Sequence, residues 1–245
     1  MTFRDIYTLQ IKTKQKFEEN LNSVLDALKA SANGSILLTP ELVLTGFCYQ
    51  KMEEANEFSK HATKALLDAS AHKTIITTMI EKKQHRFYNN LKVFHNGELV
   101  HKQAKHELFF LGDEHLHFAA GALDEIIPFR IGDITCGALI CFELRFIELW
   151  QRLRGVDMIF IPAQWGKARK DHFETLCKAL AIGNECFVIA SGSANLQMAK
   201  SSAIITPYGK VHKDDKLEAI HAKVDLSEVE KMRKYINIGI KECTK

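Results

Sequence analysis

The sequence has little cysteine, no long hydrophobic run and no excess of charge of one sign, and each shortage excludes a class of protein. Six cysteines in 245 residues are far too few for a disulfide-stabilised scaffold. No stretch approaches the roughly 20 apolar residues that a membrane helix requires. Lys and Arg number 33 and Asp and Glu number 30, so the net charge of +3 does not indicate a partner such as nucleic acid or a membrane surface.

The N-terminal residues and the spacing of the cysteines narrow the possibilities further. Arg4 and Asp5 lie where a secretory signal peptide would have its apolar run, so we predict a cytoplasmic protein with reduced thiols. No Cys-x-x-Cys pair is present. Cys136 and Cys141 lie five residues apart across one predicted strand, which would point their side chains to opposite faces, so a structural zinc site is not expected.

Short apolar runs alternate with helical patterns along the chain, and this alternation predicts an α/β fold. No linker or low-complexity segment divides residues 1–245, so we predict a single domain. Asn96-Gly97 favours a type I′ hairpin turn, and Asp171 and Glu174 have the spacing of a helical capping box. Apolar spacing predicts helices over 17–28, 58–66, 142–154 and 171–181, and strands over 35–39, 74–80, 87–94, 98–102, 125–130, 135–140, 157–161, 187–191, 203–206 and 218–224.

Two predicted strands, ending at Pro40 and Pro162, each follow an amphipathic helix, which hints at two similar halves. Ligands of open α/β sheets bind at the carboxyl ends of strands, so polar residues at such ends are candidates for a site. The apolar run 134–140 predicts a strand with Cys141 as its last residue, and Phe142 opens the next predicted helix.

A thiol at such a turn would point toward a cleft, and the positive end of the helix would favour its thiolate. The backbone N–H of Phe142 could then donate to an oxyanion. The alternative is a buried structural thiol, which describes most free cysteines and fits the contexts of Cys48, Cys136, Cys177 and Cys186 better. The residues alone favour this second interpretation of Cys141 as well.

Three charged residues are candidate partners for such a nucleophile. Glu41 follows Pro40 amid apolar sequence, where desolvation would raise its pKa toward that of a general base. An exposed loop glutamate is the commoner interpretation of that pattern. Lys105 follows the predicted hairpin strand and could stabilise an oxyanion, although a lysine there is usually solvated. Glu114 carries no signal of its own.

Taken together and in this order, these segments resemble the nitrilase superfamily, the carbon–nitrogen hydrolases. Pro40-Glu41 followed by Thr45-Gly46-Phe47 is similar to the glutamate motif of that family, and Lys105-His106-x-Leu108-Phe109 is similar to its lysine motif. The cysteine motif, usually Cys-Tyr-Asp-Leu-Arg-Phe, is matched by Cys141-Phe142-Glu143-Leu144-Arg145-Phe146. Further matches include 113–118, 162–165, 179–184 and 207–209, so the resemblance covers roughly residues 4 to 235.

The resemblance implies a four-layer α-β-β-α sandwich and a homodimer or larger homo-oligomer. It also implies a Glu41-Lys105-Cys141 triad with Glu114 as a second glutamate, and hydrolysis of a small amide through a cysteine thioester, with no metal or organic cofactor. The short chain and the 113–118 segment are most similar to ω-amidases, which act on monoamides of dicarboxylic acids. The alternatives are an N-carbamoyl amino acid amidohydrolase, a nitrilase, and a catalytically silent binding member.

Three further residues could line the substrate pocket, namely Gln164, Trp165 and Arg145. The competing interpretations are a core position for Trp165 and a structural ion pair for Arg145, and we favour the ion pair. Departures from the family pattern at Leu180, Gly183 and 200–202 leave the pocket shape or subunit packing open.

Overall fold

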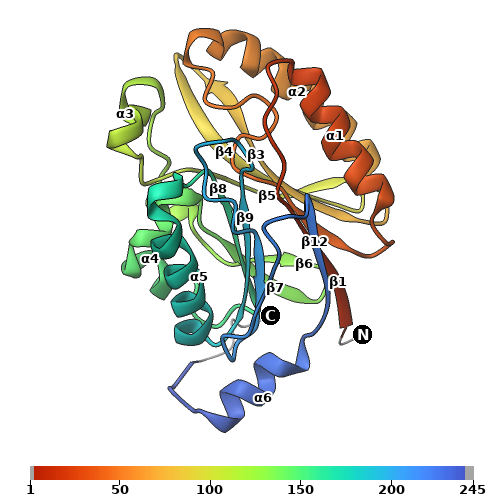
Figure 1. Cartoon of the computed structure of the whole chain (residues 1–245), viewed down its shortest axis with the longest axis vertical. Coiled ribbons are helices and arrows are strands. Elements are labelled where there is room, and N and C mark those ends of the chain that lie inside the picture. Colours follow the sequence, from red (N-terminus) through yellow and green to blue (C-terminus); the bar gives the residue numbers. More distant parts are fainter. Residues whose placement is uncertain (1–2, 241–245) are drawn as a thin grey trace.

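The computed structural model describes residues 3–240 and contains two six-stranded mixed sheets (Figure 1). The first sheet has the order β12 (Ala219–Asp225), β1 (Phe3–Leu9), β2 (Ile36–Leu38), β3 (Thr74–Lys83), β4 (Arg86–His95) and β5 (Glu98–Ala104). The second has the order β11 (Val211–Lys213), β10 (Ala203–Ile205), β9 (Phe187–Gly192), β8 (Met158–Ala163), β7 (Ile134–Ala138) and β6 (Phe129–Ile131).

Helices cover the outer faces of both sheets. The first sheet carries α1 (Phe17–Ala30) and α2 (Met52–Ala69), and the second carries α4 (Ile147–Arg152) and α5 (Lys170–Asn184). The short helix α3 (Glu114–His117) projects from one side, and α6 (Ser227–Tyr235) lies at the end away from it. The layers therefore run helix, sheet, sheet, helix, which confirms the predicted α-β-β-α sandwich.

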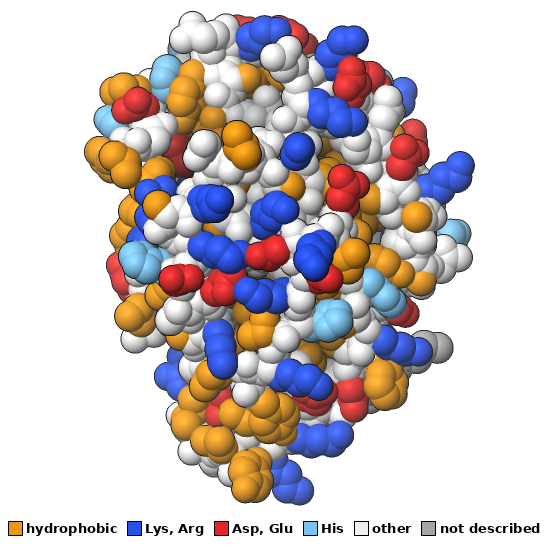
Figure 2. All heavy atoms as spheres, viewed as in Figure 1, with side chains coloured by type: hydrophobic (Ala, Val, Ile, Leu, Met, Phe, Trp, Pro, Cys, Tyr) orange, Lys and Arg blue, Asp and Glu red, His pale blue; other side chains and the backbone are white. Residues whose placement is uncertain are grey.

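The alternation of side chains along β2 shows how the layers are held together. Leu37 packs with α1 and α2 on the outer side, whereas Ile36 and Leu38 belong to the cluster shared with the second sheet. Both faces of the strand are buried, which explains why its sequence is continuously apolar. Charged side chains of both signs mix over the middle of the face shown in Figure 2, in keeping with the balanced composition.

Parallel pairing places the carboxyl ends of several strands together. In the first sheet β1, β2 and β3 are mutually parallel, and in the second β7, β8 and β9 are. The segments that follow β2, β7 and β8 hold Glu41, Cys141 and Gln164 respectively. Lys105 comes directly after β5.

Several predicted elements are confirmed and others need correction. Asn96 and Gly97 have φ values of +52° and +82°, as a type I′ turn requires, between the antiparallel strands β4 and β5. The predicted strand 125–130 is wrong over most of its length, since β6 begins only at Phe129, directly after Pro128. Strand β1 was not predicted, because Arg4 and Asp5 interrupt its apolar pattern.

The ends of two helices also differ from the prediction. The segment Cys141–Arg145 is a 3-10 turn, and the α-helix begins only at Ile147. The capping box is wrong, because α5 begins at Lys170 and no side chain caps it. Glu174 instead pairs with Lys170 at 3.1 Å and Lys213 at 2.7 Å. No helix within residues 3–240 is both long enough and apolar enough to span a membrane.

Candidate active site

Three buried charged side chains meet between the two sheets. The Lys105 ammonium donates to Glu41 Oε1 at 2.8 Å and to Glu114 Oε1 at 2.7 Å. Lys105 and Glu41 are fully buried, and Glu114 is 3% exposed. An ammonium has three N–H donors, so the third remains for another acceptor. The structure thus brings together three of the four residues that the sequence indicated as catalytic.

The two oxygens of Glu41 have different surroundings. Oε1 accepts hydrogen bonds from Lys105 and, at 2.9 Å, from the side-chain amide of Asn89 in β4. Oε2 is buried and has no partner in the part of the chain that the structure describes. A buried carboxylate oxygen without a donor is costly, so it is a candidate acceptor for a proton during a reaction. Sequence reasoning missed Asn89, whose only signal is an amide within a buried strand.

The electrostatics of this cluster keep Lys105 charged. Burial alone would lower the pKa of Lys105, but Glu41, the Cys141 side chain and Glu114 raise it well above its usual value. Burial raises the pKa of Glu114, and the Glu41 carboxylate adds to this, while Lys105 opposes both. The cluster therefore holds two carboxyl groups around one permanent cation.

Cys141 lies at a sharp turn with φ = +54°, a left-handed conformation that costs energy for any residue with a β-carbon. The strand β7 ends at Ala138, so the prediction that Cys141 is the last residue of a strand is wrong by three positions. Cys141 is 7% exposed and lines a recess. The backbone N–H of Phe142 donates no hydrogen bond within residues 3–240 and is open to an acceptor.

The expected lowering of the thiol pKa is wrong. Burial raises the pKa of Cys141 well above its usual value, and Glu41 raises it further. Lys105 and the backbone N–H of Gln164 act in the opposite direction and do not compensate. The turn after Cys141 is also too short to supply the dipole of a full helix. The resting group is therefore a thiol, and its proton needs an acceptor.

The two pocket candidates after β8 have mixed roles. Gln164 lines the recess, and its side-chain amide also donates to the backbone carbonyl of Glu41 at 2.7 Å. The Trp165 indole N–H donates to the carbonyl of Cys141 at 3.2 Å, and its ring packs 5.4 Å from that of Phe173. Trp165 is thus both a core residue, 5% exposed, and part of the wall.

The recess beside Cys141 is partly open to solvent, and about 250 Å³ of space lies between its walls when the open solvent at its mouth is included. Its walls are aromatic and cationic. Arg145 lies 4.6 Å over the Trp165 ring, and Arg169 lies 5.3 Å over the Phe109 ring. Residues lining the recess are Phe109, Cys141, Phe142, Arg145, Gln164, Trp165 and Arg169.

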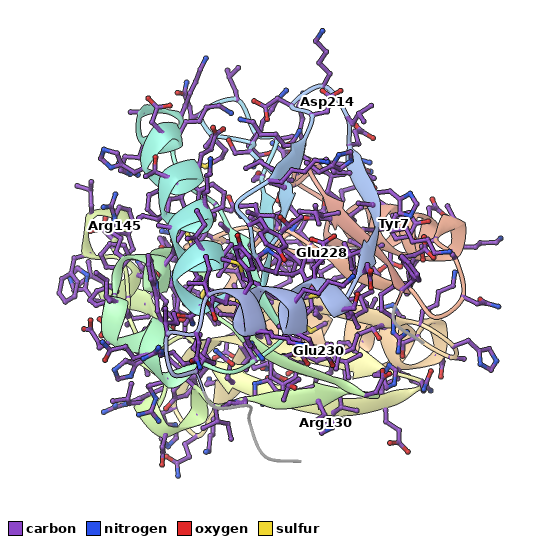
Figure 3. All side chains as sticks on the ribbon, turned by 90° about the horizontal axis from the view of Figure 1, so that it is seen from below. Tyr7, Arg130, Arg145, Asp214, Glu228 and Glu230 are labelled. Carbon is purple, nitrogen blue, oxygen red and sulfur yellow. The ribbon has the colours of Figure 1, made fainter. Side chains whose placement is uncertain are left out.

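The favoured interpretation of Arg145 as a structural ion pair is wrong. Within residues 3–240 neither Arg145 nor Arg169 pairs with a carboxylate, and Arg145 instead contacts the His172 ring at 3.1 Å. Figure 3 places Arg145 at the edge of the molecule beside α5. Arg169 was not predicted, since a lone arginine near a helix start carries no sequence signal.

The departures from the family pattern lie away from these contacts. Leu180 is buried in the core between α5 and the second sheet, and Gly183 faces open space on α5. Lys200 and Ser201 both have positive φ values, near +60°. The Ser201 hydroxyl accepts a hydrogen bond from the Lys170 ammonium and donates one to the Glu174 carboxylate. Among the described residues, no group of three or more His, Cys, Asp or Glu side chains is arranged to hold a metal ion.

Comparisons with known proteins show the family of the chain. A model of the family described as Carbon-nitrogen hydrolase matches residues 6–234. The 2-oxoglutaramate amidase of Bacillus subtilis is 30% identical over 224 residues, which are 86% of this chain and 85% of that protein. The omega-amidase YafV of Escherichia coli is 26% identical over 201 residues, or 78% of this chain and 77% of that protein.

Solved structures show the same fold. A Saccharomyces cerevisiae member of branch 10 of the nitrilase superfamily has a TM-score of 0.84 at 19% identity, over 98% of this chain and 96% of that chain. The family match spans both sheets and every candidate catalytic residue described above. The chain therefore belongs to the carbon–nitrogen hydrolase family.

Proposed function

We propose that this carbon–nitrogen hydrolase is an amidase that cleaves a small primary amide through a thioester on Cys141. The observation that carries the proposal is the unpartnered, buried Oε2 of Glu41 in the same site as a protonated thiol. Lys105 occupies the other oxygen of Glu41, so the base is held in one orientation. No metal or organic cofactor enters the scheme.

The first half of the reaction forms the thioester. Glu41 takes the Cys141 proton as the sulfur attacks the amide carbon, and the carbonyl oxygen becomes an oxyanion. The third N–H of Lys105 and the backbone N–H of Phe142 bind that oxyanion. When the tetrahedral adduct collapses, the C–N bond breaks and Glu41 transfers its proton to the nitrogen, which leaves as ammonia.

The second half returns the enzyme to its starting state. Glu41 takes a proton from water as the water oxygen attacks the thioester carbon, and the same donors bind the second oxyanion. Collapse breaks the C–S bond, and the sulfur recovers the proton from Glu41. Glu114 holds Lys105 in place throughout, since Glu114 Oε1 accepts a hydrogen bond from the Lys105 ammonium. Glu114 is not among the residues that line the recess.

For the substrate we propose monoamides of dicarboxylic acids. Arg145 and Arg169 stand at the recess without a carboxylate partner in the described part of the chain, so they are available to a carboxylate on the substrate. The relatives named 2-oxoglutaramate amidase and omega-amidase support the same class. An N-carbamoyl amino acid is the second candidate, because it also carries a carboxylate.

One assay separates these possibilities. Purified protein is incubated with a series of ω-amides, N-carbamoyl amino acids and nitriles, and ammonia and carbon dioxide are measured. We expect ammonia without carbon dioxide from the ω-amides, and no turnover by Cys141→Ala. Carbon dioxide release would indicate the carbamoyl activity. Ammonia release that survives Cys141→Ala would exclude the thioester scheme, and a stable adduct without turnover would indicate a silent binding member.

We also propose a cytoplasmic homodimer or larger homo-oligomer. All five cysteines within the described residues are free, as in a reducing compartment. Ile147 on α4 and Ile182 on α5 are 59% and 43% exposed on the outer helical layer, which a second copy could cover. Light scattering after gel filtration should give at least twice the 27.8 kDa chain mass, and a monomer across the micromolar range would contradict this.

A further inference from the structure

Glu143 is a buried carboxylate that the proposed reaction does not use. It lies two residues after Cys141 and is fully inaccessible to solvent. One oxygen accepts the backbone N–H of His106 at 2.6 Å, and the other accepts the backbone N–H of Ile140 at 2.6 Å. The backbone N–H of Glu107 also faces it. Within residues 3–240 it forms no ion pair.

The positions of these donors are significant. His106 directly follows Lys105, and Ile140 directly precedes Cys141. The first segment leaves the sheet at β5 and the second leaves the other sheet at β7. Glu143 therefore connects the two loops that carry the candidate oxyanion lysine and the candidate nucleophile, which no strand pairing connects.

Each of the two loops also has hydrogen bonds of its own near this carboxylate. The Glu143 backbone N–H donates to the Ile140 carbonyl at 3.1 Å, so Ile140 and Glu143 exchange two hydrogen bonds across the strained Cys141. On the other loop, Gly121 donates to the Lys105 carbonyl at 2.7 Å, and the His106 ring contacts the Gly121 carbonyl at 2.7 Å. The carboxylate joins two loops that each have hydrogen bonds of their own.

A carboxylate is costly at this position, which suggests that it has a purpose beyond packing. Burial raises the pKa of Glu143 to about 7, even though backbone donors from both loops lower it. A neutral side chain would avoid that cost. Only an ionised carboxylate, however, can accept hydrogen bonds at both ends without presenting a donor to either loop.

We propose that Glu143 is a positioning residue that sets the location of the Cys141 sulfur relative to Lys105 and Glu41. The inference rests on the proposed function, since it assigns a geometry to that reaction. Loss of the connection should let the two loops move apart by a fraction of an ångström to an ångström. Misplacement of that size can reduce the rate of the chemical step about 100-fold while leaving substrate binding largely intact.

The test compares Glu143→Gln, Glu143→Asp and a matched control. Glutamine keeps the length but turns an NH₂ group toward one of the two backbone donors, whereas aspartate keeps two acceptor oxygens. Glu185→Gln changes another buried glutamate, 1% exposed, at the far end of α5. We expect kcat of Glu143→Gln to fall about 100-fold with KM within about threefold, partial recovery in Glu143→Asp, and wild-type kcat in the control.

A second measurement does not depend on knowing the substrate. Iodoacetamide alkylates Cys141 at a rate that requires the sulfur to be near its base, and peptide mass spectrometry distinguishes it from the half-exposed Cys48. We expect this rate to fall at least about tenfold in Glu143→Gln and to recover in Glu143→Asp. If wild-type protein turns over no amide, the proposed function fails but the alkylation comparison still decides.

Two results would overturn the inference. One is a folded Glu143→Gln protein with wild-type kcat and alkylation rate. The other is an equal loss in Glu143→Gln and Glu143→Asp, which would mean that double acceptance by a carboxylate is not what matters. If Glu143→Gln does not fold, Glu143→Asp is compared with wild type by its KM and kcat separately, and a rise in KM alone would contradict a positioning role.

Discussion

Replacement of Lys105 by methionine should destabilise the protein in a pH-dependent way, because Lys105 is the cation between two buried carboxyl groups. Its ammonium lies 2.8 Å from Glu41 and 2.7 Å from Glu114, and none of the three groups is more than 3% exposed. Removal of one partner from a buried ion pair costs about 3–5 kcal/mol, because the other charge is left uncompensated. For a chain of this size each kcal/mol lowers Tm by roughly 2–4 °C, so Tm should fall by roughly 6–20 °C.

The sign of the pH dependence follows from the carboxyl groups that remain. The pKa of Glu114 is already raised by burial, and it rises further once the opposing effect of Lys105 is gone. A carboxyl group with a raised pKa binds its proton more tightly in the folded state than in the unfolded state. The stability deficit of Lys105→Met should therefore be largest at pH 8 and should shrink as the pH falls toward 5.

Urea denaturation at pH 5, 6.5 and 8 measures the deficit, and two controls isolate its cause. Lys105→Met combined with Glu114→Gln removes one of the stranded carboxyl groups and should recover part of the stability but no activity. Lys92→Met is a matched control, because Lys92 is 4% exposed and pairs with Glu81 at 2.6 Å, but Glu81 keeps Lys102 at 2.7 Å. A deficit in Lys105→Met that is absent, or that is equal at pH 5 and pH 8, would refute the reasoning.

Three further outcomes follow from the site and can be measured separately. Because the Cys141 thiol has a raised pKa, its alkylation rate by iodoacetamide should keep rising to pH 9, and a plateau below pH 7 would contradict this. Arg169→Met should lower kcat/KM for an ω-amide about 10- to 100-fold, because it removes a hydrogen bond between two charged groups. The kcat/KM for a neutral amide such as propionamide should be almost unchanged. Gly121→Ala places a Cβ 2.3 Å from the carbonyl oxygen of Ala104 at the end of β5. The substitution should lower the free energy of unfolding by about 1–3 kcal/mol, measured by thermal unfolding, and should remove most of the ammonia release. Gly183→Ala is its control, since that helical site is open and alanine should stabilise it by about 0.5–1 kcal/mol.

Local structure could be predicted from the sequence wherever a few adjacent residues decide the conformation. Asn96-Gly97 predicted its hairpin because both residues must adopt positive φ, and they do. The apolar run at 36–38 predicted a buried strand because both faces of that strand are covered, and all three residues are buried. Strand β1 escaped prediction because its polar residues find partners far along the chain: Arg4 pairs with Asp133, and Asp5 contacts His221 at 2.8 Å.

The site was less readable, because its properties arise from contacts between distant segments. The motif around Cys141 was recognisable, but the direction of its pKa shift depends on burial and on Glu41, one hundred residues away. Arg145 was expected to form an ion pair because charged residues usually do, yet the neighbouring surface is an indole ring. Asn89 is not part of any motif, and the motif that contains Glu143 does not show what Glu143 contacts, since each acts through one or two hydrogen bonds across the structure.

The location of the charges explains why the two sheets must pack before a site exists. Glu41 and Lys105 follow strands of one sheet, whereas Cys141 and Gln164 follow strands of the other, so neither sheet alone holds both a base and a nucleophile. Packing removes water from Glu41, Lys105 and Glu114 together, which strengthens their mutual interaction and also makes each one costly if it is left unpaired. Among the buried side-chain oxygens and nitrogens of the cluster, Glu41 Oε2 and the carbonyl oxygen of Asn89 have no hydrogen-bond partner within residues 3–240. Glu41 acts electrostatically on the Cys141 thiol, so its unpartnered Oε2 is an acceptor in the same site as the proton that the proposed reaction has to move.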